Sequence, residues 1–214
     1  MIQIKICGLR EPEHVETAID AGADYVGVIL YSQARRYLDP HVARELFLSV
    51  TRRHVGVVGI FVNESADHIN RIADLIGLDI VQLGGDEPIE LAAQVERQVA
   101  RTVHVGGDTT IANVFSRIAN ADFIHLDARK VGSYGGTGTT FDWKFAARTR
   151  SLGQIWLAGG LNPDNVEEAI RIAGPPLVDV SSGGETDGRK DSTKIRSFVA
   201  AARRAVAGEA SIAR

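Results

Sequence analysis

The chain repeats one pattern along its length: a short apolar run followed by a longer amphipathic stretch. Alternation of period two predicts strands, and apolar residues three and four apart predict helices. Strands that alternate strictly with helices form a parallel sheet with right-handed crossovers. The predicted strands are Ile2–Cys7, Tyr25–Leu30, Gly56–Val62, Ile80–Leu83, Thr102–Val105, Phe123–Asp127, Gln154–Ala158 and Leu177–Ser181. The predicted helices are Glu13–Ala21, His41–Val50, Ser65–Ile76, Glu90–Arg101, Ile111–Ile118, Trp143–Thr149, Asp164–Ile172 and Ser192–Val206.

Eight such units favour one closed (β/α)8 TIM barrel, an α/β fold, over an open doubly wound sheet. A dinucleotide-binding sheet would place a glycine-rich GxGxxG motif after the first strand, and Cys7-Gly8-Leu9-Arg10 is not one. We therefore predict a single catalytic domain over residues 1–206. The small, polar tail at residues 207–214 is expected to fray.

Composition excludes several classes of protein. The net charge of −3 gives no electrostatic basis for binding nucleic acid or an anionic membrane. One cysteine cannot form an internal disulfide, and the six histidines show no metal-ligand spacing. The first residues lack the pattern of a signal peptide, and no apolar run is long enough to cross a membrane. We expect a cytoplasmic enzyme without metal; the sequence assigns no oligomeric state.

Two strand ends carry candidate acid and base groups. Cys7 ends the first strand on the face of Lys5, opposite Ile4 and Ile6, and Asp127 ends the sixth strand. TIM barrels place their chemistry at the C-terminal ends of the strands, so both side chains are predicted to reach the barrel mouth. A buried small core residue is the other common role of a free cysteine.

The last two strands end in glycine-rich loops. Gly159 and Gly160 follow the seventh strand, and Ser181, Ser182 and Gly183 follow the eighth. Glycines let backbone N–H groups approach an anion, and barrels often bind phosphate between these two loops. Glycine also simply terminates strands, but its presence in both loops favours phosphate binding.

Several motifs together resemble the phosphoribosylanthranilate isomerase family of tryptophan biosynthesis. In chain order they are KICGLR at 5–10, GADYVG at 22–27, RRY at 35–37, GIFVN at 59–63, DIVQLGGDE at 79–87, LDAR at 126–129, GGTGTTFDW at 135–143, LAGGLNPDNV at 157–166 and DVSSG at 179–183. The resemblance implies an Amadori rearrangement of N-(5'-phosphoribosyl)anthranilate to 1-(2-carboxyphenylamino)-1-deoxyribulose 5-phosphate. It implies no cofactor and a small-molecule phosphoribosyl substrate as the partner.

The resemblance also implies residue roles. Cys7 matches the family's general base and Asp127 its general acid, which requires a raised pKa at Asp127 and a thiolate at Cys7 favoured by Lys5 or Arg36. Arg36, directly before Tyr37, matches the arginine that suits the anthranilate carboxylate. The run 131–138 is predicted to be a mobile flap.

The chain departs from the family pattern at two glycines. Gly84 stands where the family usually has a histidine, and Gly184 stands where it commonly has a branched apolar residue. Two alternatives therefore stay open. One is a related barrel isomerase acting on another phosphoribosyl substrate, and the other is a non-catalytic phosphosugar-binding paralogue.

Overall fold

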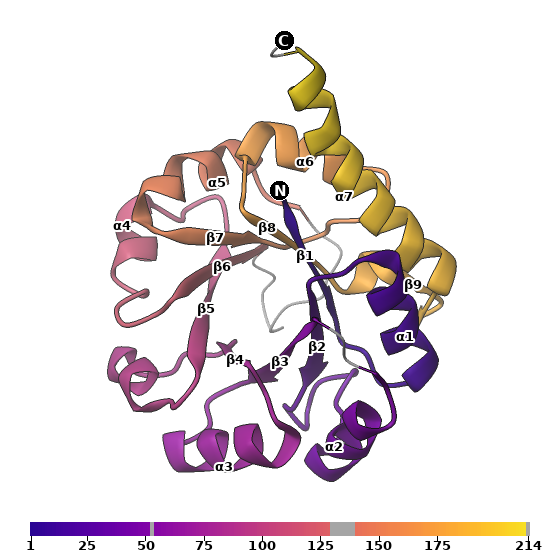
Figure 1. Ribbon diagram of the computed structural model, residues 1–214. Coiled ribbons are helices and arrows are strands. Elements are labelled where there is room, and N and C mark those ends of the chain that lie inside the picture. The colour runs from indigo at the N-terminus through magenta and orange to yellow at the C-terminus, as the bar shows by residue number, and fades with distance from the viewer. Residues whose placement is uncertain (52–53, 129–139, 213–214) are drawn as a thin grey trace.

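Eight parallel strands close into a barrel in chain order, with β1 paired to both β2 and β8 (Figure 1). The computed structural model describes residues 1–51, 54–128 and 140–212, and side chains up to residue 207. The strands are β1 Gln3–Cys7, β2 Tyr25–Ile29, β3 Gly56–Phe61, β4 Ile80–Leu83, β5 Gln98–Val105, β6 Phe123–Ala128, β7 Gln154–Leu157 and β8 Leu177–Val180. The predicted (β/α)8 barrel is confirmed.

Helices surround the barrel and bury their apolar faces against it (Figure 1). They are α1 Pro12–Ala21, α2 Pro40–Leu48, α3 Ala66–Ile76, α4 Ile111–Phe115, α5 Trp143–Thr149, α6 Val166–Ala173 and α7 Ser192–Ile212, with 3-10 turns η1 Ile89–Gln94, η2 Arg150–Leu152 and η3 Ser182–Gly184. Local signals set their ends: the Ser65 hydroxyl accepts from the N–H of His68 at the start of α3, and Gly77 ends it in the left-handed region. The helix α7 continues past the predicted end at Val206.

The predicted helix Glu90–Arg101 is wrong. The short turn η1 occupies its first part, and β5 begins at Gln98, four residues before the predicted strand start at Thr102. Gln98 pairs with Ile80 on β4, and Arg101 pairs with Ile124 on β6. Pairing with two neighbouring strands therefore overrides a local pattern that was compatible with a helix.

The barrel interior is filled in layers. An apolar layer at the strand starts is stacked around Trp156, whose ring centroid lies 4.8 Å from that of Phe123 and 5.6 Å from that of Tyr25. Two residues further along several strands lies a polar layer of Lys5, Gln82, Thr102, His125 and Asp179, all buried. The apolar layer closes one end of the pore, so the polar layer forms the floor of a cavity that opens at the C-terminal end.

A small hairpin follows β8 at this open end. Its strands, β9 Glu185–Thr186 and β10 Arg189–Lys190, pair antiparallel and connect η3 to α7. The hairpin brings Glu185 and Lys190 into the interior beside the barrel mouth, where both side chains are almost fully buried. No helix in the described part of the chain has the length and apolar character to span a membrane.

Candidate active site

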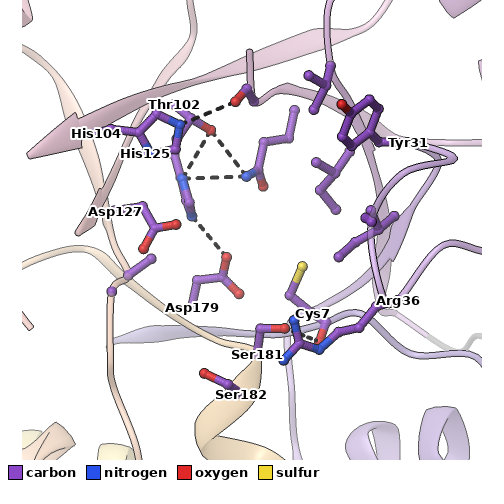
Figure 2. Close-up of a pocket in the computed structure, with 18 of the residues that line it drawn as sticks. Cys7, Tyr31, Arg36, Thr102, His104, His125, Asp127, Asp179, Ser181 and Ser182 are labelled. Atoms are coloured by element: carbon purple, nitrogen blue, oxygen red, sulfur yellow. Dashed lines mark hydrogen bonds and ion pairs between the residues drawn. The ribbon is translucent and has the colours of Figure 1, made fainter. Parts of the chain in front are cut away.

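A cavity of about 470 Å³ occupies the C-terminal mouth of the barrel. Strand periodicity explains its lining, because residues two apart on one strand face the same side. His125 and Asp127 on β6 both line it, whereas Ile124 and Leu126 belong to the core between strands and helices, as the sequence pattern predicted. Cys7, Arg36, Gly159, Gly160, Ser181 and Ser182 also line the cavity, so the structure gathers nearly all predicted site residues in one place (Figure 2).

Cys7 lies at the end of β1 with its thiol in the cavity (Figure 2). Burial raises the pKa of the Cys7 thiol, and the charges of Lys5 and Lys190 oppose that effect without cancelling it. Lys5 thus acts in the predicted direction, although desolvation, which disfavours the thiolate, is the larger effect. Lys190, which sequence reasoning missed, is the second cation that acts on the thiol.

Asp127 lies on the cavity wall at the end of β6. Burial raises the pKa of Asp127, while His125 and His104 act in the opposite direction. The raised pKa favours the protonated carboxyl, in agreement with the protonation state expected for a general acid. Both its place on the cavity wall and the direction of its pKa shift are compatible with an acid.

An imidazole lies beside the glycine that departs from the family pattern. His104 on β5 places its Nε2 3.3 Å from the carbonyl oxygen of Gly84, and both residues line the cavity. The ring nitrogen donates, since a carbonyl oxygen only accepts. This side of the cavity therefore carries an imidazole on β5.

A buried polar network forms the cavity floor. Lys5 Nζ donates to Gln82 Oε1 at 2.9 Å and to Asp179 Oδ2 at 2.7 Å, and His125 Nε2 lies 3.0 Å from the same Asp179 oxygen. Thr102 Oγ1 lies 3.2 Å from His125 Nδ1 and 3.3 Å from Gln82 Nε2. Burial alone would raise the pKa of Asp179, but Lys5 and His125 lower it to about 2. The floor therefore holds a permanent carboxylate.

Arg36 is buried at the mouth and held by Glu185. Its Nε and Nη2 both donate to the Glu185 carboxylate, the latter at 2.9 Å. Arg35 reaches the same carboxylate at 2.6 Å and Lys190 lies 3.3 Å from it, although the Arg35 side chain is 56% exposed. Burial alone would raise the pKa of Glu185, but Arg36, Lys190 and Arg35 lower it to about 2. The three cationic side chains surround a single carboxylate. The cluster therefore has a net positive charge at the wall of the cavity.

The two glycine-rich loops meet at the same end. Gly159 and Gly160 both have positive φ, and a Cβ on Gly159 would lie 2.5 Å from the backbone nitrogen of Ala128. Gly183 is packed against the other loop, because a Cβ there would lie 1.9 Å from the carbonyl oxygen of Leu161. Gly183 therefore allows the close approach of the loops and is not itself among the lining residues.

The serines of the eighth loop have different positions. Ser181 Oγ donates to the carbonyl oxygen of Cys7 at 3.2 Å, which links this loop to the end of β1. Ser182 lines the cavity, as does Gly160 of the other loop. The helix α6 begins at Val166, later than the predicted Asp164, after a turn in which Asn162 Oδ1 accepts from the N–H of Asp164.

Sequence reasoning missed Glu185 and Lys190 as site residues. Glu185 follows directly after the glycine that was noted as a departure, and this adjacency to the DVSSG motif was an available signal. Nothing in the local pattern around Lys190 indicated that its side chain would be buried. The predicted flap at 131–138 lies outside the described residues. Within them, no group of three or more His, Cys, Asp or Glu side chains is arranged to hold a metal ion.

Comparison with known proteins identifies the family of the chain. The family model described as N-(5'phosphoribosyl)anthranilate (PRA) isomerase matches residues 4–201. A relative from Roseiflexus sp. (strain RS-1), named N-(5'-phosphoribosyl)anthranilate isomerase, is 42% identical over 212 residues, which cover 96% of this chain and 99% of that protein.

Solved structures give the same result. The crystal structure of phosphoribosyl anthranilate isomerase from Thermotoga maritima is similar with a TM-score of 0.87 and 35% identity, covering 95% of this chain and all of that one. A second isomerase structure, in complex with reduced 1-(o-carboxyphenylamino)-1-deoxyribulose 5-phosphate, matches with a TM-score of 0.84 and 34% identity over the same shares. The chain thus belongs to the N-(5'-phosphoribosyl)anthranilate isomerase family.

Proposed function

We propose that this chain catalyses the Amadori rearrangement of N-(5'-phosphoribosyl)anthranilate to 1-(2-carboxyphenylamino)-1-deoxyribulose 5-phosphate in tryptophan biosynthesis. The observation that carries the proposal is the presence of Cys7 and Asp127 on separate walls of one cavity in a chain of this family. An aldose-to-ketose rearrangement needs one group that donates a proton and one that removes a proton. In this cavity Asp127 can donate the proton and Cys7 can remove one.

Asp127 is proposed as the general acid. Its protonated carboxyl donates to the ribose ring oxygen while the bond from C1 to that oxygen breaks and its electron pair goes to the oxygen. The nitrogen lone pair forms a C1=N bond, which gives a protonated Schiff base. Burial raises the pKa of Asp127, which favours the protonated carboxyl that this step needs.

Cys7 is proposed as the general base. Its thiolate removes the proton from C2, the C2–H electron pair forms a C1=C2 bond, and the C=N electron pair returns to nitrogen. Tautomerisation of the resulting enolamine gives the ketose, so the reaction is redox-neutral and uses no cofactor. Lys5 and Lys190 supply the positive charge that supports the thiolate.

The two ends of the substrate have separate anchors in this proposal. Arg36 binds the anthranilate carboxylate through the guanidinium nitrogen Nη1, since Nε and Nη2 are held by Glu185. The backbone of Gly159, Gly160 and Gly183 and the serines Ser181 and Ser182 bind the phosphate. The partner is thus a small phosphoribosyl compound, and we place the enzyme in the cytoplasm, where a catalytic thiol stays reduced.

The test follows the fluorescence of freshly generated N-(5'-phosphoribosyl)anthranilate after addition of the protein. Wild-type protein should remove the signal, and Cys7→Ala should be slower by about 10²-fold or more with an unchanged circular dichroism spectrum. No loss of signal with folded wild-type protein would refute the function and favour a paralogue with another substrate. Full activity in Cys7→Ala would refute the role of the thiol alone.

A further inference from the structure

Only one of the two carboxylate oxygens of Asp179, on the cavity floor, accepts hydrogen bonds from the described part of the protein. Its Oδ2 accepts from both Lys5 and His125, at 2.7 Å and 3.0 Å. Its Oδ1 is buried and has no hydrogen-bond partner among the described residues, while the side chain lines the cavity. A buried carboxylate oxygen without a partner is costly, so such an oxygen at the edge of a cavity indicates a partner that binds there.

Asp179 lies between the two proposed proton-transfer groups. Figure 2 shows its carboxylate between Asp127 and Cys7 on the cavity floor. Its negative charge raises the pKa of both groups, which places it electrostatically close to each. The reacting carbons of a substrate that bridges Cys7 and Asp127 would therefore lie over Asp179.

Asp179 is unsuited to proton transfer at neutral pH. Lys5 and His125 keep its pKa at about 2, so it is ionised throughout the working range. A fixed charge in a buried site acts most strongly on charge that develops during the reaction. In the proposed sequence the only cation formed is the Schiff base, which appears when the ring opens and disappears when C2 loses its proton.

We propose that Asp179 is a further catalytic residue, whose free Oδ1 stabilises the cationic Schiff base between ring opening and proton removal from C2. This inference rests on the proposed isomerase function and extends it. The carboxylate is preorganised, because Lys5 and His125 hold Oδ2 in place, while Oδ1 has no hydrogen-bond partner among the described residues. The alternative is that Asp179 serves only as the counter-ion of buried Lys5.

The variant Asp179→Asn separates the two possibilities, because it keeps the shape and removes the charge. Steady-state kinetics should show kcat lower by about 10²-fold. Calorimetry should show little change in affinity for reduced 1-(o-carboxyphenylamino)-1-deoxyribulose 5-phosphate, whose nitrogen is neutral. The matched control is Asp24→Asn, which removes a carboxylate that accepts from the backbone N–H of Ile4 outside the cavity and should keep wild-type kcat.

A folded Asp179→Asn variant with wild-type kcat would overturn the proposal. Equal losses of kcat and of affinity for this ligand, in which the nitrogen is uncharged, would also overturn it, because they indicate a purely structural role. If the single variant does not fold, Lys5→Gln combined with Asp179→Asn removes both charges of the pair and avoids an uncompensated ammonium. A folded double variant should show a kcat loss at least as large, and wild-type kcat there would refute the inference. An inactive wild-type protein would instead refute the proposed isomerase function. That outcome is therefore distinguishable from failure of the inference about Asp179.

Discussion

Glu185 offers the sharpest quantitative test of the electrostatics at the mouth. Its carboxylate is buried and is shared by Arg36, Arg35 and Lys190. Glu185→Gln keeps the side-chain volume and removes the negative charge. Arg36 and Lys190, both almost fully buried, then lose their counter-ion.

The magnitude follows from the change in pKa on folding. The pKa of Glu185 falls from its ordinary value of 4.5 to about 2 in the folded protein. That difference corresponds to about 3 kcal/mol of folding stability at neutral pH. Removing one partner of a buried ion pair costs a similar amount, about 3–5 kcal/mol. A carboxylate with a lowered folded-state pKa contributes this stability above pH 4.5, and the contribution is lost as the pH falls toward 2.

Urea unfolding followed by circular dichroism measures the effect. At pH 7 the free energy of unfolding of Glu185→Gln should be about 3 kcal/mol below that of wild type. The difference should shrink steadily from pH 4.5 to about 2. Arg35→Ala is the control, because this exposed side chain should contribute less than about 1 kcal/mol. A difference that is absent at pH 7, or that stays constant down to about pH 2, would refute the reasoning.

Three further changes test the site. Asp127→Asn cannot donate the first proton and should lower kcat by about 10²–10⁴-fold in the fluorescence assay with little change in unfolding free energy; near-wild-type kcat would contradict the assignment. Arg36→Ala should raise KM more than it lowers kcat, and an unchanged KM would point to Arg35 or another anchor. Gly183→Ala should weaken substrate binding and raise KM, because its Cβ would lie 1.9 Å from a backbone oxygen of the neighbouring loop. Gly184→Ala is the matched control, since its Cβ would come no closer than 3.8 Å to Ile195, and equal effects of the two changes would contradict the packing argument.

The fold was predictable because its evidence is local and repeated. Period-two alternation placed His125 and Asp127 on one face of β6, and the structure confirms that both line the cavity. The same kind of reasoning failed at Gln98–Arg101, where a helical pattern lies in a strand. In that segment the pairing with β4 and β6 decides the conformation, and no short window of sequence contains those partners.

The site was predictable as a set of residues and less so as an electrostatic arrangement. The sequence determined that Cys7, Asp127 and the two glycine-rich loops come to one barrel mouth, because chain order and strand periodicity are sufficient for that. The tertiary structure decided that burial raises the pKa of the Cys7 thiol and that Glu185 holds Arg36, 149 residues away along the chain. It also decided that one carboxylate oxygen of Asp179 has no hydrogen-bond partner within the described part of the chain, while Lys5 donates to the other. Local patterns encode which way a side chain points, whereas desolvation and long-range ion pairs exist only once the barrel has closed.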